Sequence, residues 1–297
     1  MIRWLKRIGI GLIVLVLLIV AAVGTVYGIV GRKLAKKYPT QVAAVSIPTD
    51  SAALERGRHL VIAVNKCVGC HGDNLAGKKI FDDGAFGTLY SANLTSGNGG
   101  VAAGFTDADF VRAIRHGIGV DGRPLVFMPS DEYYYMNDSD LGAVIAYLKT
   151  VKPVDHTVPP RKIGIMGRVV HQLAGFPPIP ATSIPAGEVS RPVVPAGPTA
   201  EYGKYLTQIG ACMGCHGPSL SGGAMIEGKV KAANITPEGL KGWTEADFVK
   251  AMRTGIRPGG RVLSAAMPWP YVGKLTDEEL RATWLYLQSV PPKKMGE

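Results

Sequence analysis

Acidic residues are missing from the first 40 positions of this 297-residue chain, although seven basic residues lie there. The whole chain carries a net charge of +10, so everything after position 40 contributes only +3. A nucleic-acid-binding protein spreads its basic charge over a folded surface that follows the phosphates. Here most of the excess positive charge, +7 of the net +10, lies at one end of the chain. The composition therefore argues against nucleic acid as a partner and favours lipid headgroups.

Cysteine is also scarce. The chain has four cysteines, and all of them fall in two copies of Cys-x-x-Cys-His: Cys67, Cys70 and His71, then Cys212, Cys215 and His216. The spacing is typical of covalent haem attachment, in which two thioethers hold the macrocycle and the adjacent histidine reaches the iron. We predict that the four cysteines bind two haem c groups and that the two histidines are iron ligands.

Other chemistries also use Cys-x-x-Cys. A thioredoxin-like redox pair needs a βαβ setting, and strand signals are sparse in this chain. A zinc ribbon would bring its two cysteine pairs much closer together than Cys67 and Cys212, which are 145 positions apart. A disulfide inside each motif would leave the following histidine, present both times, without a role. Covalent haem accounts for every residue of the motif.

An uncharged apolar run occupies residues 8–31. At 1.5 Å per residue, a helix of this length would cross a bilayer core of about 30 Å. A cleavable signal peptide is the alternative, but its apolar part is shorter, about 7 to 15 residues. We predict an uncleaved membrane anchor. In bacteria covalent haem is attached outside the cytoplasm, so we expect one pass through the cytoplasmic membrane and everything after Arg32 on the periplasmic side.

The chain contains an internal repeat. "CVGCHGDNLAG" matches "CMGCHGPSLSG", "SANLT" matches "AANIT", and "FTDADFVRAIRHGI" matches "WTEADFVKAMRTGI". A Pro-rich stretch separates the two copies and favours an extended connector, with one short helix in "GIMGRVVHQLAG". We predict an anchor at 1–40, a first domain at 41–153, a connector at 154–196 and a second domain at 197–297.

Helix signals dominate both copies. Thr106 and Thr244 have the sequence context of helix N-caps, and the last apolar-periodic helix of each copy is followed by Pro153 or Pro291. Strand signals are few. The predicted fold class is all-α, with two tandem helical domains behind a transmembrane helix.

A haem iron that is held by one histidine has a second axial position, which electron carriers close with Met or His. A true ligand should recur in both copies. The last helices align at an offset of 139 residues, which matches Met128 to Met267 and matches Met136 to Leu275. We therefore predict Met128 and Met267 as axial ligands and Met136 as a packing residue at the start of the last helix.

Two further pairs recur. Asn93 and Asn234 stand in the "SANLT" and "AANIT" segments, and we expect them at the haem edge, with the amide bonding a propionate. Gly57 and Gly203 precede the first cysteine of each motif, and they would allow the first and last helices to cross closely.

With Cys-x-x-Cys-His, a later Met-Pro and a capped C-terminal helix, each copy resembles a class I cytochrome c domain. The string "GFTDADFVRAIRHGIGVDGRPL" and its surroundings look similar to the cytochrome c subunits of membrane-bound bacterial dehydrogenases for alcohol, gluconate or aldehyde. Those subunits often carry three haem domains, and this chain has two motifs.

The resemblance implies an electron carrier that is not itself an enzyme. The donor would be a dehydrogenase or a quinol-oxidising complex, and the acceptor a terminal oxidase or a soluble cytochrome. An alternative is the dihaem subunit of a cbb3-like terminal oxidase. A dihaem enzyme, such as a peroxidase or thiosulfate dehydrogenase, would need an open iron, which the matched Met-Pro pair argues against.

Overall fold

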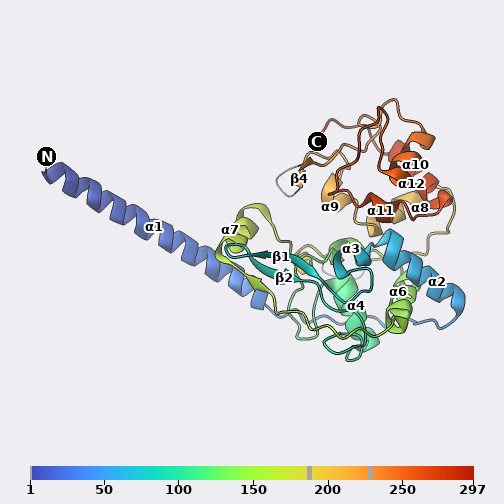
Figure 1. The fold of residues 1–297 in the computed structure, drawn as a ribbon, viewed down its shortest axis with the longest axis horizontal. Helices are drawn as coiled ribbons and strands as arrows, with labels where there is room; N and C mark the ends of the chain where they lie inside the picture. Colours follow the sequence, from blue (N-terminus) through green and yellow to red (C-terminus); the bar gives the residue numbers. More distant parts are fainter. Residues whose placement is uncertain (1, 186–188, 227–229) are drawn as a thin grey trace.

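The computed structural model describes residues 2–185, 189–226 and 230–297. One long helix, α1 (Ile2–Ala35), projects from a two-part helical body (Figure 1). Of the described helices, α1 is the one with the length and apolarity to cross a membrane. Its apolar side chains are almost all exposed, as expected for a segment whose solvent is lipid.

The first part of the body carries the first Cys-x-x-Cys-His motif. It begins with α2 (Ser51–His59) and a π-helical turn, η1 (Leu60–Val64), and the motif itself forms α3 (Cys67–His71). The other elements in order are β1 (Lys79–Asp83), β2 (Gly87–Tyr90), α4 (Asp107–His116), α5 (Ser130–Tyr133) and α6 (Asp138–Thr150).

The second part repeats this plan. Its elements in order are α8 (Ala200–Ile209), α9 (Met213–His216), β4 (Met225–Ile226), β5 (Val230–Lys231), α10 (Glu245–Thr254), α11 (Trp269–Val272) and α12 (Asp277–Ser289). The expected all-α class with two tandem domains is confirmed. Among the described residues, the strands form only one three-stranded sheet, in which β1 and β2 are joined by β3 (Lys162–Ile163) in the order β1-β2-β3, and one two-stranded hairpin, β4-β5.

The connector is more ordered than its Pro-rich composition predicts. It supplies β3 (Lys162–Ile163), which pairs antiparallel with β2, then α7 (Ile165–Ala174) and a 3₁₀ turn, η2 (Pro180–Thr182). The expected short helix is therefore present as α7. The strand was missed because two residues are too short a signal for period-2 patterning. The proposed domain boundaries at 154 and 196 stay a prediction.

Helix starts follow the predicted capping chemistry. Thr106 and Thr244 each form a reciprocal capping box with the aspartate three residues later. Thr276 does the same with Glu279. Asn137 caps α6 through its side chain, but Asp140 does not complete the box, because its carboxylate is engaged by the side chains of Arg56 and Tyr205.

The first and last helices of each domain cross at a glycine, as expected. A Cβ at Gly57 would lie 2.0 Å from the carbonyl oxygen of Ala143, and one at Gly203 would lie 1.9 Å from that of Ala282. Real Cβ atoms essentially never approach a backbone oxygen so closely, so any side chain here would force the helices apart.

The π-helical turn has a cause in the sequence. Cys67 follows Gly57 by ten positions, whereas Cys212 follows Gly203 by nine. The first domain accommodates the extra residue in η1, where the Asn65 amide donates to the Leu60 carbonyl at 2.7 Å. Such π-bulges absorb single insertions without ending a helix, and they are frequent at functional sites.

The two domains share one apolar core. Leu60 and Leu141 of the first domain belong to the same buried cluster as Leu206 and Leu280 of the second. A smaller cluster around Leu89, Val126 and Ile179 joins the sheet to the connector and to Leu34 at the end of α1.

Candidate haem-attachment sites

The residue before the first cysteine has the same unusual backbone in both motifs. Lys66 has φ 55° and Ala211 has φ 54°, which is the left-handed region that side chains rarely adopt. This kink separates the preceding helix from the short helix of each motif: α3 contains the whole first motif, and α9 contains the second motif except Cys212, which is its N-cap. Strained backbone of this kind persists where the surrounding structure enforces it, and it clusters at functional sites.

The turn after each motif is also built twice in the same way. Leu75 and Leu220 are left-handed, with φ of 59° and 61°. The amide of Gly77 donates to the His71 carbonyl at 2.7 Å, and that of Gly222 donates to the His216 carbonyl at 2.8 Å. The chain therefore folds back beneath each histidine and fixes its position.

Each histidine is oriented by a backbone carbonyl. His71 Nδ1 lies 2.7 Å from the carbonyl oxygen of Ala92, and His216 Nδ1 lies 2.7 Å from that of Ala233. Nδ1 must therefore be the protonated nitrogen, since a carbonyl oxygen only accepts. Nε2 then keeps its lone pair, which is the form that binds iron. Burial lowers the pKa of both imidazoles and so favours the neutral form further.

The cysteine thiols are unpaired, and their residues are half-buried. Desolvation raises the pKa of Cys67 to about 12, and it also raises the pKa of Cys70, Cys212 and Cys215. A redox dithiol needs the opposite shift, toward the thiolate. Within the described residues no three His, Cys, Asp or Glu side chains gather as a metal site would require. These surroundings do not favour a redox dithiol, and attachment of haem by the four cysteines stays the prediction.

The predicted methionine ligands stand in equivalent loops. Met128 and Met267 each precede a proline that begins a one-turn helix, α5 or α11, and the amide two residues later donates to the methionine carbonyl at 2.8 Å in both domains. Both side chains are half-buried against the shared core. The structure preserves the equivalence on which the ligand prediction rests, and the ligation itself stays a prediction.

Met136 lies elsewhere in the same loop. It is 1% exposed, and Leu275, its counterpart, is 6% exposed. Both occupy the position just before the N-cap of the last helix and belong to the core. They pack the entry of that helix, as expected.

Asn93 and Asn234 hold the loop that orients each histidine. The Asn93 amide donates to the carbonyls of Val154 and His156, at 2.8 and 3.1 Å, and the Asn234 amide donates to Lys293 at 2.6 Å. Both amide hydrogens of Asn93 are thus engaged by backbone carbonyls, and the expected propionate bond stays a prediction. Contact with the haem edge stays a prediction for both residues.

The two motifs meet at the interface between the domains. Gly69, inside the first motif, packs against the ring of Tyr271 in α11, where a Cβ on the glycine would lie 3.4 Å from Cε2. Gly214, inside the second motif, faces Glu132 in α5, where a Cβ would lie 3.6 Å from the carboxylate. Glu132 and Tyr271 are equivalent positions at the 139-residue offset. Each motif therefore lies against the short helix that follows the other domain's Met-Pro.

Lys66 places its ammonium between the motifs. Its Nζ donates to the carbonyl of Val64 at 2.8 Å and to the carbonyl of Gly210 in the other domain. Desolvation lowers the pKa of this ammonium, and the electrostatic effect of the nearby Cys212 opposes that shift without cancelling it. Burial and the charge of Asp131 raise the pKa of Glu132 to about 7. One basic and one acidic group thus share the junction.

Side chains from equivalent helix positions cross the interface in both directions. His59 Nε2 lies 2.6 Å from Glu279 Oε2, and the Tyr205 hydroxyl donates to Asp140 at 2.7 Å. His59 matches Tyr205 in the repeat, and Asp140 matches Glu279. Arg56 joins the two carboxylates, with a bidentate contact to Asp140 and a contact of 3.2 Å to Glu279. The domains are therefore related by a pseudo-twofold arrangement.

The cytochrome c family matches the chain at residues 54–152 and again at residues 200–291. The chain belongs to the cytochrome c family. The domains of this family carry covalently bound haem c, and the two matched regions each contain one motif. The long apolar helix α1 lies outside both regions.

Several curated proteins are similar to this cytochrome. It is 30% identical over 279 residues to the fructose dehydrogenase cytochrome subunit of Gluconobacter japonicus, covering 83% of this chain and 55% of that protein. It is 29% identical over 296 residues to a nicotinate dehydrogenase subunit of Pseudomonas putida, covering 90% and 24%. It is 27% identical to a diheme cytochrome c-type protein of Cereibacter sphaeroides, covering 69% and 73%. The first two relatives are much longer than the region this cytochrome matches.

Sequence reasoning missed two kinds of group: the carbonyls that orient the histidines and the side chains that lie between the two motifs. The carbonyls of Ala92 and Ala233 orient the histidines, and each stands one residue before the recurring asparagine. The recurrence of "SANLT" and "AANIT" was the available signal, but the prediction drawn from it concerned the asparagine side chain and not the alanine carbonyl before it. Lys66, Glu132 and Tyr271 had no signal, because the two copies differ in residue type at these positions.

Proposed function

We propose that this cytochrome is a membrane-anchored dihaem electron carrier that passes electrons from a dehydrogenase or quinol-oxidising complex toward a terminal oxidase or a soluble cytochrome. The observation that carries the proposal is the duplication of one attachment site. Backbone kink, return turn and histidine hydrogen bond recur in both domains with matching geometry. A catalytic site and a carrier site in one chain would be expected to differ.

In this proposal Cys67 and Cys70 bind the first haem, and Cys212 and Cys215 bind the second. Haem c, when bound, supplies a one-electron couple at each site. His71 and His216 present Nε2 to the irons because their Nδ1 atoms donate to backbone carbonyls. Met128 and Met267 would be the second protein ligands of the two irons, and such methionine ligands would raise the potentials and leave no site for a substrate.

The interface suggests a route between the two sites. Each motif packs on the short helix that follows the other domain's axial methionine, and Lys66 bridges the strained turns. Electrons would then cross the junction directly, since the two attachment segments are neighbours. With α1 as a single membrane pass, the domains proposed at 41–153 and 197–297 lie on the periplasmic side.

The nature of the donor is drawn from the relatives. Proteins named as cytochrome subunits of fructose dehydrogenase and of alcohol dehydrogenase (quinone) cover most of this chain. They support a dehydrogenase as the donor. The substrate of that enzyme is left open, because this chain spans little more than half the length of these two relatives.

The test has two parts. The intact mass of the full chain, purified from membranes in mild detergent, should exceed the polypeptide mass by two haems, and Cys67→Ser with Cys70→Ser should remove one. Affinity purification should then recover a dehydrogenase. Recovery of a copper and haem oxidase core instead would favour the cbb3-like alternative, and a chain without covalent haem would refute the proposal.

A further inference from the structure

Helix α7 presents its apolar residues outward. Ile165, Met166, Leu173 and Phe176 are all exposed, and Leu173 reaches 81% exposure. Ile165, Met166 and Leu173 follow the spacing of one helical face, and Phe176 comes directly after Gly175, which ends the helix. A helix that packs on a protein in water buries such a face. The exposed face of α7 therefore needs an apolar environment outside the protein.

The inward face of α7 is small or polar. Gly167 approaches the Phe86 carbonyl so closely that a Cβ would lie 2.5 Å from it. Arg168 lies over the Tyr27 ring of α1, 3.9 Å from its centroid, and donates to the Tyr27 carbonyl at 3.1 Å. Gln172 accepts from Lys33 at 3.4 Å. The helix is thus held against α1 by its polar side, with its apolar side turned away.

α7 contacts α1 near the C-terminal end of the apolar run. α7 packs beside Tyr27, Val30 and Lys33, at the end of the apolar run. Val30 is 1% exposed there, although most side chains of α1 are exposed. The basic residues that follow the run are Arg32, Lys33, Lys36 and Lys37. Tyrosine and then basic residues are typical of the level where hydrocarbon gives way to headgroups.

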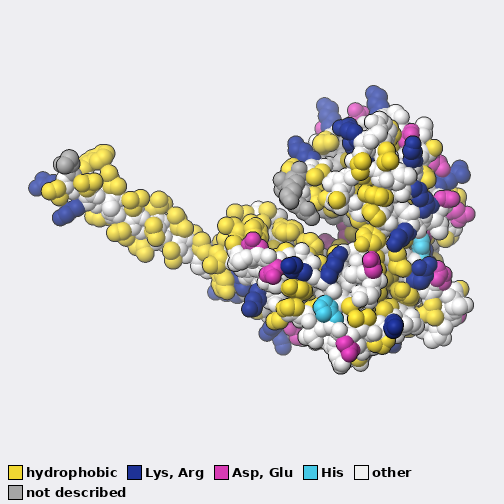
Figure 2. Space-filling model, viewed as in Figure 1, with side chains coloured by type: hydrophobic (Ala, Val, Ile, Leu, Met, Phe, Trp, Pro, Cys, Tyr) yellow, Lys and Arg dark blue, Asp and Glu magenta, His cyan; other side chains and the backbone are white. Residues whose placement is uncertain are grey.

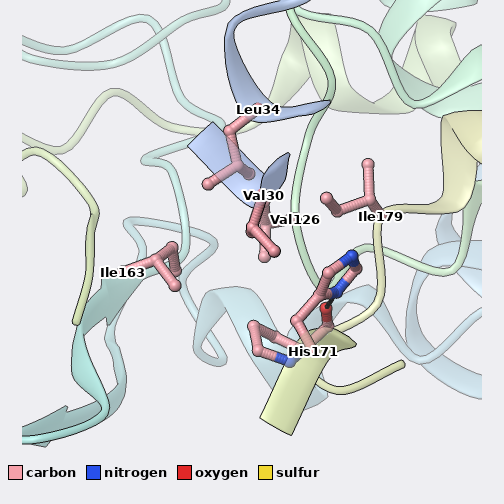
Figure 3. A pocket seen from close by; sticks show the side chains of 7 residues that line it. Val30, Leu34, Val126, Ile163, His171 and Ile179 are labelled. Atoms are coloured by element: carbon pink, nitrogen blue, oxygen red, sulfur yellow. Dashed lines mark hydrogen bonds between the residues drawn. The ribbon is translucent and has the colours of Figure 1, made fainter. Parts of the chain in front are cut away.

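Apolar residues make a second contact between α1 and the body. Val30 and Leu34 of α1 converge with Val126, Ile163 and Ile179 on a small apolar pocket, with His171 of α7 at its edge (Figure 3). His171 Nδ1 donates to the Pro177 carbonyl at 2.8 Å. The space-filling view shows an apolar surface where the long helix joins the body, continuous with the apolar side of that helix (Figure 2).

We propose that α7 lies in the surface of the same bilayer that α1 crosses, with Ile165, Met166, Leu173 and Phe176 immersed among the acyl chains. The occupant of this face is lipid, because the face continues the lipid-facing surface of α1 and is flanked by basic residues that attract anionic headgroups. This inference rests on the proposed anchoring by α1.

The consequence concerns the first haem site. The Phe176 ring packs edge-on against Phe127, with centroids 5.7 Å apart, and Phe127 is adjacent to the proposed ligand Met128. The Phe127 amide also donates to the Pro178 carbonyl at 2.9 Å. Immersion of α7 would therefore hold the first domain against the membrane, with its methionine loop near the lipid surface.

The test uses the full holoprotein in vesicles of phosphatidylcholine and phosphatidylglycerol that contain a phosphatidylcholine with a diazirine on its acyl chain. After illumination, mass spectrometry locates lipid adducts along the chain. We expect adducts on α1 and on the peptide that covers Ile165–Ala174, and none around Val262, which is 70% exposed in the second domain. The variant Met166→Asp with Leu173→Asp should lose at least fivefold of the α7 adducts, whereas Val262→Asp should change nothing.

Three results would count against the inference. Adducts on α1 without adducts on α7 would overturn it and leave the anchor intact. A lack of adducts on both helices would overturn the anchor as well, so the two failures are distinguishable. Retention of full α7 labelling in the double aspartate variant would also overturn it, because two carboxylates cannot remain among acyl chains.

Discussion

Glu279 makes several of the contacts that dock the two domains together. It is 4% exposed, and its carboxylate contacts His59 and Arg56 of the first domain, at 2.6 and 3.2 Å. It also caps its own helix by accepting from the Thr276 amide at 3.0 Å. Replacing it with alanine removes all of these bonds and leaves two partly buried basic side chains facing a void.

The expected cost follows from the partners that remain. Removing one member of a buried charge pair costs about 3 to 5 kcal/mol when the other is left uncompensated. Arg56 keeps its bidentate bond to Asp140, so the lower end of that range, about 3 kcal/mol, is expected for Glu279→Ala. The free energy of unfolding in urea, followed by circular dichroism on the detergent-solubilised holoprotein, measures it.

The matched control is Asp247→Ala. Asp247 closes the same capping box with Thr244 at the start of α10, but its bonds to Thr244 are exposed and stay within that helix. Its loss removes the cap alone and should cost clearly less than the loss of Glu279. If the two variants were equally destabilised, the interdomain contacts would contribute nothing, and the reasoning about the interface would be wrong.

Three further predictions concern packing, charge and pH. Gly57→Ala should destabilise the holoprotein by about 1 to 3 kcal/mol in the same urea assay, because its Cβ would meet the Ala143 carbonyl oxygen, and a gain in stability would contradict the close crossing. Lys66→Met should lower the midpoint potentials of both haems in a redox titration, because it removes a positive charge between the two motifs, while the exposed Lys152→Met should leave them unchanged. For scale, a unit charge that acts over about 10 Å at an effective dielectric constant of about 20 contributes about 1.7 kcal/mol, or about 70 mV. Burial alone would raise the pKa of Glu279, but the hydrogen bond and charge of His59, the Thr276 amide and the charge of Arg56 together lower it. Its contribution to stability is therefore complete above a pH of about 4.5 and is lost as the pH falls below that value, so wild type and Glu279→Gln should converge in stability in acid.

Local chemistry and the internal repeat made much of this structure predictable. Capping boxes at Thr106 and Thr244 gave the starts of two helices, because the cap satisfies backbone amides within a few residues. The close crossings at Gly57 and Gly203 followed from the recurrence of glycine. The separation of Met128 from Met136 needed only the alignment of the copies to each other, and the loops are indeed equivalent.

What was missed depends on contacts between distant segments. The bonds from His59 to Glu279 and from Tyr205 to Asp140 join residues 220 and 65 positions apart, and neither pair has a local signal. Comparison of the copies even concealed them, because His59 and Tyr205 differ in type although they occupy equivalent positions. The exposed apolar face of α7 was missed for another reason: its pattern predicts an amphipathic helix but not which face turns outward.

The central claim is that each domain holds one haem between a histidine and a methionine. The most direct measurement is the absorption spectrum of the oxidised full chain, in the long-wavelength band that arises from methionine bound to ferric haem, for the variants Met128→Ala, Met267→Ala and Met136→Leu. Each alanine variant should lose half of the band, and Met136→Leu should retain all of it. An unchanged band in both alanine variants, or a loss in Met136→Leu, would contradict the account.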